Sequence, residues 1–366
     1  MKKIYGLLAI LLTLLFGVFI LLKINTPVKI ALIGDFEEEG NAFCTTSLFA
    51  ARIAEEQINK DKGIFGRKIK IIIKNTNFSD TETIFEELKK ENVELIISTA
   101  TSENLVKIRP FLKKYDMICL SANATATSLS GIEDNIYKLL PDDSEEVQAL
   151  FDHLDKDKIE KNFTVIYNKE NKEYVASVES EILKRGGRIA YKITWQEHYE
   201  LFEVNYPQEI MNSSAILTLC SATESAFVAQ KLNMIDIKNK PIFSFSWSGD
   251  YNLIEYGGKS IEGFTVITPI DISSKYGHYD ALEKELASFN KKNSMITATT
   301  YEAIYIARDI YGEKFTKHKS LKSILSDRES FEGIESKISF DKYGDSKRKE
   351  YILRANKGEF SKVEDK

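Results

Sequence analysis

The chain has 366 residues, 43% of them apolar, so it is long enough to bury a large core and to form two domains. Its 50 basic and 55 acidic residues are interspersed and give a net charge of −5. This balance argues against a nucleic-acid partner, because phosphate binding requires a basic face, and it is typical of a solvated surface.

The first segment, residues 1–24, is predicted to be a signal peptide or an N-terminal membrane anchor. Two lysines precede a run of 19 residues without charge, residues 4–22, and Lys23 follows it. Lysines before an apolar run hold the N-terminus on the cytoplasmic side, and this run is close to the minimum length for crossing a bilayer. Because no Ala-x-Ala cleavage site follows, an anchor in the membrane is favoured over a cleaved signal. Both alternatives predict an extracytoplasmic location, in the periplasm or on the outer face of the cytoplasmic membrane.

A first series of alternating strands and helices follows this segment. Short apolar strands are predicted at residues 29–33, 68–74, 95–98, 117–120 and 135–140, with helices at 46–59, 80–91 and 103–115. Strands that alternate with helices in this way form parallel sheets with right-handed crossovers.

A second series begins after Pro141, which interrupts the pattern. Its strands are predicted at residues 163–167, 188–194, 215–220, 241–245 and 263–267, with helices between them. The two series predict an α/β protein with two Rossmann-like lobes, each built around a parallel sheet.

Two consecutive strands of the first series end in turns of small hydroxyl and amide residues. Leu95–Ser98 is followed by Thr-Ala-Thr and Ser102, and the next strand runs into residues 121–128, which include Asn123 and Thr125. In an open parallel sheet, ligands collect outside the carboxyl ends of the strands. Hydroxyls and accessible backbone N–H groups there suit a carboxylate ligand. Ordinary helix capping is the alternative explanation, because Ser and Thr are favoured at helix N-termini.

The sequence lacks the common motifs for catalysis, nucleotides and zinc. The first strand is followed by Gly34-Asp35-Phe36-Glu37 rather than a dinucleotide fingerprint, and neither a phosphate-binding loop nor a nucleophile elbow occurs. The three cysteines and four histidines are widely spaced, without a CxxC or HxxxH pair. Residues 37–39 are three glutamates, but adjacent carboxylates on a loop usually face water. We therefore expect no enzymatic activity, no cofactor and no metal site.

Five segments, in order along the chain, carry a resemblance to a known family. They are AARIAEEQIN with GIFGRK (50–59 and 63–68), VIYN with Tyr174, GGKSIEG (257–263), YEA (301–303), and FEGIESKISFD (331–341) continuing to Gly344-Asp345. With these segments the chain resembles the extracytoplasmic substrate-binding proteins of branched-chain amino-acid ABC transporters, the leucine/isoleucine/valine-binding family. The similarity runs from about Lys29 to Phe360 and implies the type I periplasmic-binding fold.

The resemblance also implies how the chain is divided. Residues 25–141 with 271–331 are expected to form lobe 1, and residues 142–270 with 332–366 to form lobe 2. Three crossing segments are expected to join the lobes as a hinge, near Pro141, at residues 268–270 and at residues 331–333.

The family's ligand-binding residues can be carried over by position. Ser102 matches the serine that hydrogen-bonds the ligand's α-carboxylate, and Asn123 and Thr125 match positions that supply a backbone group and a hydroxyl. In lobe 2, Tyr174 corresponds to an aromatic residue that closes over the ligand. Ser221 and Ala222 follow the strand that offers a further contact.

One departure from the family pattern leaves the ligand's identity open. Members that bind amino acids often place a carboxylate after the strand that corresponds to residues 241–245, where it pairs with the ammonium. Here that turn contains Trp247 and ends at Asp250. Trp247 is expected to cover an apolar or cationic group with its ring face, with packing on the lobe surface as the alternative. Asp250 is expected to replace the carboxylate from a shifted position.

The resemblance implies a solute-binding component of an ABC importer, with an ABC permease in the membrane as partner. Its small-molecule ligand is expected to be an amino acid or a similar small polar solute, held between the lobes by hinge closure. The alternatives are a membrane-anchored, ligand-sensing receptor domain that reports to a partner protein, and a relative that has lost ligand binding.

Overall fold

The computed structural model describes residues 26–36, 42–75, 80–169, 171–196, 200–203, 206–235, 237, 240–274 and 277–363, together with Tyr5. The predicted membrane segment, residues 4–22, lies outside this part of the chain apart from Tyr5. Within the described residues, no helix combines the length and the apolar character needed to cross a membrane.

In the described part of the chain, the first sheet contains five parallel strands in the order β2-β1-β3-β4-β5. They are β1 (Val28–Gly34), β2 (Ile69–Asn75), β3 (Leu95–Ser98), β4 (Ile118–Ser121) and β5 (Ile136–Lys138). Helices α2 (Ala42–Lys60), α3 (Thr81–Lys90) and α4 (Ser102–Tyr115) connect them. The four residues of β3 are all buried, as expected of a strand covered by helices on both faces.

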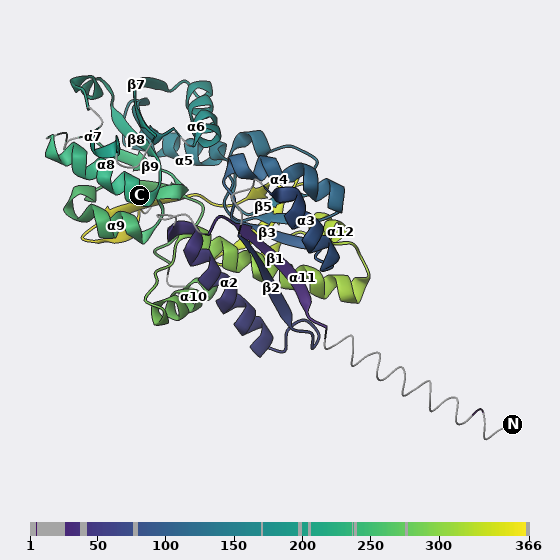
Figure 1. Ribbon diagram of the computed structural model, residues 1–366. Helices are drawn as coiled ribbons and strands as arrows, with labels where there is room; N and C mark the ends of the chain where they lie inside the picture. The colour runs from purple at the N-terminus through teal and green to yellow at the C-terminus, as the bar shows by residue number, and fades with distance from the viewer. Residues whose placement is uncertain are drawn as a thin grey trace.

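The second sheet has seven strands among the described residues, in the order β15-β14-β10-β9-β8-β6-β7. Its parallel strands are β6 (Asn162–Asn168), β7 (Arg188–Trp195), β8 (Ala215–Leu219), β9 (Ile242–Ser244) and β10 (Thr265–Thr268). The C-terminal hairpin of β14 (Tyr351–Asn356) and β15 (Glu359–Lys362) adds two antiparallel strands beside β10. The helices that accompany the second sheet are α5 (Asp143–Lys156), α6 (Lys172–Lys184), α7 (Glu200–Glu203), α8 (Ala222–Met234) and α9 (Tyr251–Gly257). The two sheets form separate lobes (Figure 1), which confirms the predicted α/β fold class.

After β10 the chain returns to the first lobe. Three helices follow there: α10 (Gly277–Ser288), α11 (Met295–Lys317) and α12 (Leu321–Asp327). The long α11 packs against α2, and the hydroxyl of Tyr301 donates a hydrogen bond of 2.5 Å to Oε1 of Gln57 across this contact. Figure 1 shows α11 and α2 running through the same lobe.

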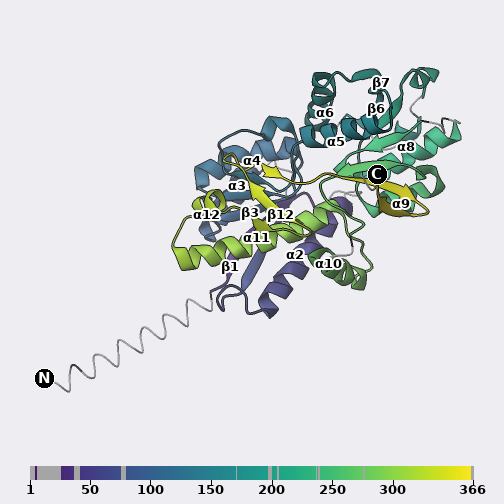
Figure 2. The ribbon, with the colours of Figure 1, turned by 180° about the vertical axis from the view of Figure 1, so that it is seen from behind.

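A small antiparallel sheet also belongs with the first lobe. It contains β11 (Phe331–Glu332), β12 (Lys337–Phe340) and β13 (Ser346–Lys347). Its Phe340 ring lies 5.5 Å from the ring of Tyr137 in β5, and Figure 2 shows β12 near α11 and α12. The third crossing to the second lobe therefore follows β13, at about residues 348–350. The expected crossing at residues 331–333, with residues 332–347 in lobe 2, is wrong, because the apolar side chains of β12 pack on the first lobe.

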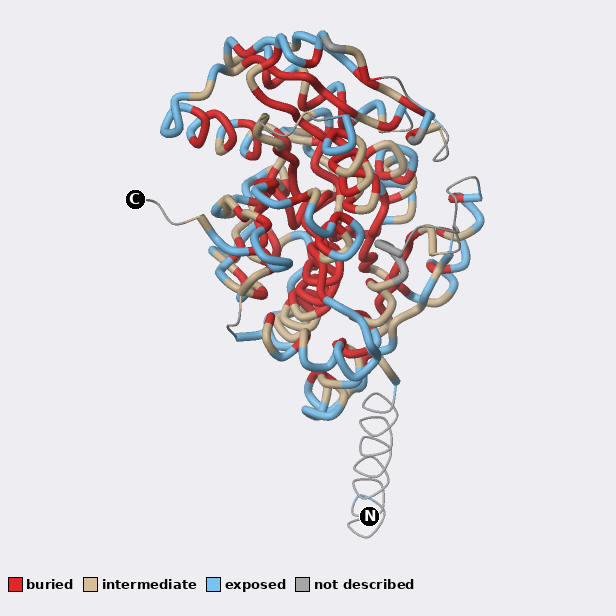
Figure 3. Tube along the Cα trace, turned by 90° about the vertical axis from the view of Figure 1, so that its left-hand side faces the viewer, coloured by how far each residue is buried: buried red, intermediate tan, exposed pale blue. Residues whose placement is uncertain are grey.

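The alternation of side chains along the central strands builds two core layers in the first lobe. Ile33 and Ile96 face one side of the sheet, in a cluster with Leu105 of α4. Leu32 and Ile97 face the other side, in a cluster with residues of α11. Figure 3 shows buried residues running through both lobes.

Candidate functional site

The polar turns after β3 and β4 meet at the carboxyl edge of the first sheet. Ser102 is the first residue of α4 and is 6% exposed. Its Oγ accepts hydrogen bonds from the backbone N–H groups of Thr125 at 3.3 Å and Ala126 at 3.1 Å. These bonds hold the two turns together and leave the Ser102 hydroxyl proton for a further acceptor.

Asn123 and Thr125 lie on the same edge. The side-chain amide of Asn123 donates to the carbonyl of Thr99 at 3.4 Å. Thr125 is buried, and its carbonyl accepts a hydrogen bond of 2.9 Å from the backbone N–H of Asp143. Because Asp143 is the first residue of α5, this bond ties the edge of lobe 1 to the first residues of lobe 2.

In the second lobe, Tyr174 and Trp247 form an aromatic pair. Tyr174 lies near the start of α6, and Trp247 lies in the short helix η3 (Ser246–Ser248) that follows β9. Their ring centroids are 5.8 Å apart and the rings are nearly perpendicular, at 89°. This is a favourable edge-to-face contact between aromatic rings.

The other carried-over residues of lobe 2 have roles at helix N-termini. Ser221 forms a capping box with Glu224 at the start of α8, and the buried Ala222 begins that helix. Asp250 caps α9 by accepting a hydrogen bond of 2.7 Å from the backbone N–H of Asn252. Burial raises the pKa of the Asp250 carboxyl to about 6. The cap gives Asp250 a structural role that does not depend on a ligand.

Direct contacts join the lobes close to these residues. The backbone N–H of Thr127 donates to Oγ of Ser177 in α6 at 3.0 Å, and the two hydroxyl oxygens lie 2.9 Å apart. The backbone N–H of Glu173 donates to Oε1 of Glu103 in α4 at 2.9 Å. Figure 1 shows α6 on the side of lobe 2 that faces α4.

Three carboxylates lie buried at the junction of the lobes. Asp143 and Glu146, both in α5, are 0% and 2% exposed, and the carboxylate oxygens of Glu350 are also buried. Among the residues that the structure describes, neither oxygen of Asp143 or Glu350, nor Oε2 of Glu146, has a hydrogen-bond partner. Oε1 of Glu146 accepts a hydrogen bond of 3.0 Å from the backbone N–H of Ser246, next to Trp247.

Burial and mutual repulsion raise the pKa values of these carboxyls. Burial is the main cause for Asp143, whose pKa rises to about 7 although the hydroxyls of Ser177 and Thr125 lower it. Those two hydroxyls stand close to Asp143 without completing a hydrogen bond of good geometry. Burial is also the main cause that raises the pKa values of Glu146 and Glu350. Repulsion from Asp143 and Asp142 adds to the rise for Glu146, and repulsion from Glu146 and Glu145 adds to the rise for Glu350.

Sequence reasoning missed these three acids. Asp143 and Glu146 lie in the first turn of a helix, where acidic residues are common because they favour the helix dipole. Glu350 lies in a charged stretch between β13 and β14. The one sequence signal for a location at the lobe junction was that Asp143 follows closely after the predicted crossing at Pro141.

Two basic side chains near the three carboxylates already have partners. Nζ of Lys138 lies 2.5 Å from Oγ of Ser130 and 3.1 Å from Oδ1 of Asp345. Arg348 pairs with Glu302, and both side chains are almost completely buried, at 2% and 1% exposure. The guanidinium also donates to the carbonyl of Leu139 at 2.7 Å, so it links two crossing segments.

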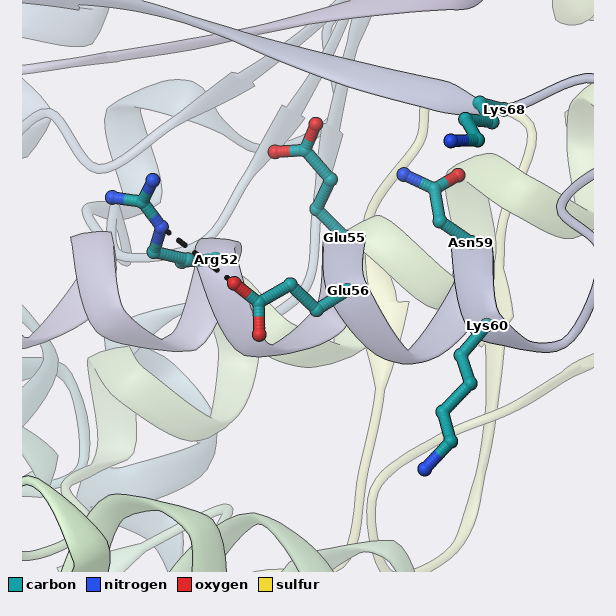
Figure 4. A pocket seen from close by; sticks show the side chains of 6 residues that line it. All are labelled: Arg52, Glu55, Glu56, Asn59, Lys60 and Lys68. Carbon is teal, nitrogen blue, oxygen red and sulfur yellow. Dashed lines mark ion pairs between the residues drawn. The ribbon is translucent and has the colours of Figure 1, made fainter.

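A shallow groove lies away from these residues, on α2 beside β2. Its volume is about 400 Å³, and Figure 4 shows the six side chains that line it: Arg52, Glu55, Glu56, Asn59, Lys60 and Lys68. Arg52 and Glu56 form an exposed ion pair of 3.8 Å within it. The groove contains none of the residues that the resemblance predicts to bind the ligand.

Metal-binding side chains do not gather in the part of the chain that the structure describes. No group of three or more His, Cys, Asp or Glu residues is arranged there to hold a metal ion. The Glu37-Glu38-Glu39 segment lies outside the described residues. Cys119 and Cys220 are buried free thiols.

Solved structures share this two-lobed architecture at low sequence identity. The leucine-binding protein LivK from Thermotoga maritima is 16% identical, with a TM-score of 0.75 over 92% of this chain and 98% of that protein. LivJ from Streptococcus pneumoniae, a branched-chain amino acid transporter substrate-binding protein in complex with isoleucine, is 16% identical, with a TM-score of 0.76 over 92% and 99%. A solute-binding protein of an ABC transporter from R. palustris, in complex with benzoate, is 11% identical, with a TM-score of 0.76 over 92% and 95%.

Sequence comparison identifies the family itself. No curated protein matches the chain in sequence. The family described as "Periplasmic binding protein" matches residues 27–357, which is nearly the whole of the chain after the predicted membrane segment. The structural likeness to LivK and LivJ agrees with the expected resemblance. The chain therefore belongs to the periplasmic binding protein family.

Proposed function

We propose that this chain is the extracytoplasmic solute-binding component of an ABC importer. It captures an amino acid or a similar small polar solute between its lobes and leaves that solute chemically unchanged. An ABC permease receives the solute, and residues 4–22 anchor the protein to the outer face of the cytoplasmic membrane.

The observation that carries the proposal is the meeting of both lobes at Asp143. Its backbone N–H donates a hydrogen bond to the carbonyl of Thr125 on the lobe 1 edge. Its carboxylate also lies near Tyr174 of lobe 2, since burial and then the carboxylates of Glu146 and Asp143 raise the pKa of that phenol. A solute at this place would touch hydroxyls from one lobe and aromatic rings from the other. Such a solute favours closure to the extent that it binds the closed form more tightly than the open form.

A thermal-shift screen of the full chain in detergent tests the proposal. Amino acids, small amides, diamines and aromatic acids are compared at equal concentration, because a ligand raises the melting temperature according to its excess over Kd. A true ligand is expected to lose affinity in Ser102→Ala. If no class of solute raises the melting temperature, the solute-binding proposal fails.

A further inference from the structure

Asp143, Glu146 and Glu350 all have buried carboxylate oxygens that find no hydrogen-bond partner among the described residues. Each carboxylate oxygen that has lost water and gained no donor costs free energy. Their positions are tied to the hinge, because α5 begins directly after the first crossing segment and Glu350 lies on the third. A ligand that supplies donors here acts on both segments at once.

We propose that the natural ligand carries a net positive charge, as a diamine or a basic amino acid does, and that Asp143 and Glu146 bind its ammonium or guanidinium group at the junction of the lobes. Glu350 lies close enough to add to the negative potential. This inference rests on the proposed function, because it names the ligand class of the same site.

The unpartnered oxygens indicate a donor-rich group. An ammonium offers three N–H donors and a guanidinium five, so either can fill several empty acceptors at once. The buried oxygens that have no donor within the described part of the chain include both oxygens of Asp143 and Oε2 of Glu146. A single zwitterion brings one ammonium, and its carboxylate would add another negative charge to the acidic cluster.

An anionic ligand would meet little available positive charge at this site. Among the described residues, the cations that act on these acids are Lys138, which is bound to Ser130 and Asp345, and Arg348, which is paired with Glu302. Neither is oriented to neutralise a ligand carboxylate without breaking an existing buried interaction.

A metal ion is also a poor match. In the described part of the chain, the acidic side chains do not come together in a set that could coordinate an ion. Carboxylates that are near one another but do not converge on one point suit an organic cation, whose N–H groups are spread in space.

The aromatic pair supplies the remaining surface of this site. Glu146 accepts from the backbone of Ser246, and Trp247 follows directly, with its ring against Tyr174. Aromatic faces attract cations and pack against apolar stems. The inferred ligand therefore has a charged nitrogen at one end of a short apolar chain.

The inference can be tested with the full chain in detergent and four probes. Arginine and putrescine are cationic, leucine is a zwitterion and benzoate is an anion. Binding is measured by thermal shift and by titration calorimetry for the wild type and for Glu146→Gln. The control is Asp152→Asn, which removes one negative charge at an exposed position further along α5. Gln at position 146 keeps an oxygen for the Ser246 N–H, so the variant is expected to fold.

We expect arginine or putrescine to bind more tightly than leucine or benzoate, with about a tenfold or greater loss of affinity in Glu146→Gln and little change in the control. If leucine or benzoate binds in preference, or if the cations bind equally well to Glu146→Gln, the inference is wrong while solute binding stands. If none of the four probes nor any solute of the wider screen binds, both the inference and the proposed function fail.

Discussion

Thr127 and Ser177 connect the two lobes directly, with the Thr127 backbone N–H 3.0 Å from Oγ of Ser177 and the hydroxyls 2.9 Å apart. Ser177 also lies close to Asp143, because its hydroxyl lowers the pKa of that carboxyl, which burial raises. Closure of the lobes therefore places a polar contact next to the buried acids.

Removing this contact is expected to favour the open form. Ser177→Ala deletes one partner of two hydrogen bonds, worth about 1 kcal/mol each, so ligand affinity should fall by about fivefold or more. Small-angle scattering should show a larger radius of gyration than for the wild type. Ser180→Ala, at an exposed position of the same helix, is the control. Equal radii for Ser177→Ala and the wild type would contradict a closing role for this contact.

Ser102→Ala is expected to lower both stability and ligand affinity. The substitution leaves the backbone N–H groups of Thr125 and Ala126 without their acceptor, and a buried unsatisfied group costs about 1–3 kcal/mol. Denaturant unfolding and calorimetric titration measure the two effects. Ser128→Ala, exposed in the same segment, should change neither. Unchanged ligand affinity in Ser102→Ala would show that Ser102 does not contact the solute.

Trp247 is expected to report ligand binding through its fluorescence. The only other tryptophan, Trp195, is 1% exposed, and its ring nitrogen donates to Glu224 at 3.3 Å. Trp247→Phe should therefore abolish the ligand-induced change in emission, whereas Trp195→Phe should keep it. The reverse pattern would place the solute away from the aromatic pair.

The buried pair of Arg348 and Glu302 is expected to be essential for the hinge. Arg348→Ala leaves the Glu302 carboxylate buried with an unpaired charge, which costs about 3–5 kcal/mol. The double variant Arg348→Met with Glu302→Leu should recover much of this loss, because no lone charge remains. Denaturant unfolding measures both. If Arg348→Ala lowers the free energy of unfolding by less than about 1 kcal/mol, the pair behaves like a solvent-exposed one and the prediction is wrong.

The apo protein is expected to lose stability as pH rises from about 4 to about 7. Asp143 has a pKa raised from 3.8 to about 7 in the folded state, so the stability that its protonated form contributes is complete below 3.8 and is lost as pH rises toward 7. Asp142 and Glu146 face it and favour protonation, while Lys138 opposes it. Asp143→Asn should flatten this dependence and stabilise the protein by about 1–3 kcal/mol at pH 8.

Unfolding free energies measured from pH 4 to pH 8 check this expectation. Asp152→Asn is the control, since Asp152 is exposed on the same helix. An unchanged pH profile in Asp143→Asn would contradict the burial of a titrating carboxyl at this position.

The sequence was sufficient to predict the central strands and the two α/β lobes. A short apolar run such as Leu95–Ser98 predicts a central strand, because its residues are buried on both faces of the sheet. The C-terminal region was less predictable. The sequence around Phe340 does not indicate that this ring packs against Tyr137 of lobe 1 rather than against a residue of lobe 2, because the contact depends on long-range packing.

The candidate site was predictable in part. Ser102 and Thr125 stood out because polar residues that follow apolar strands gather at one edge of a parallel sheet. Glu146 could not be found in this way, because an acid in the first turn of a helix looks the same whether it faces water or the junction of two lobes. Asp250 shows the opposite case. It follows a strand, as a ligand-binding residue would, but the structure explains its position by the N-terminal cap of α9.

The position of a bound solute in a crystal structure of this protein tests the central claim most directly. The solute is expected between the lobes, in contact with Ser102 on one side and with the ring of Trp247 on the other. A solute bound to one lobe alone, or in the groove lined by Arg52 and Lys68 on α2, would contradict capture by hinge closure.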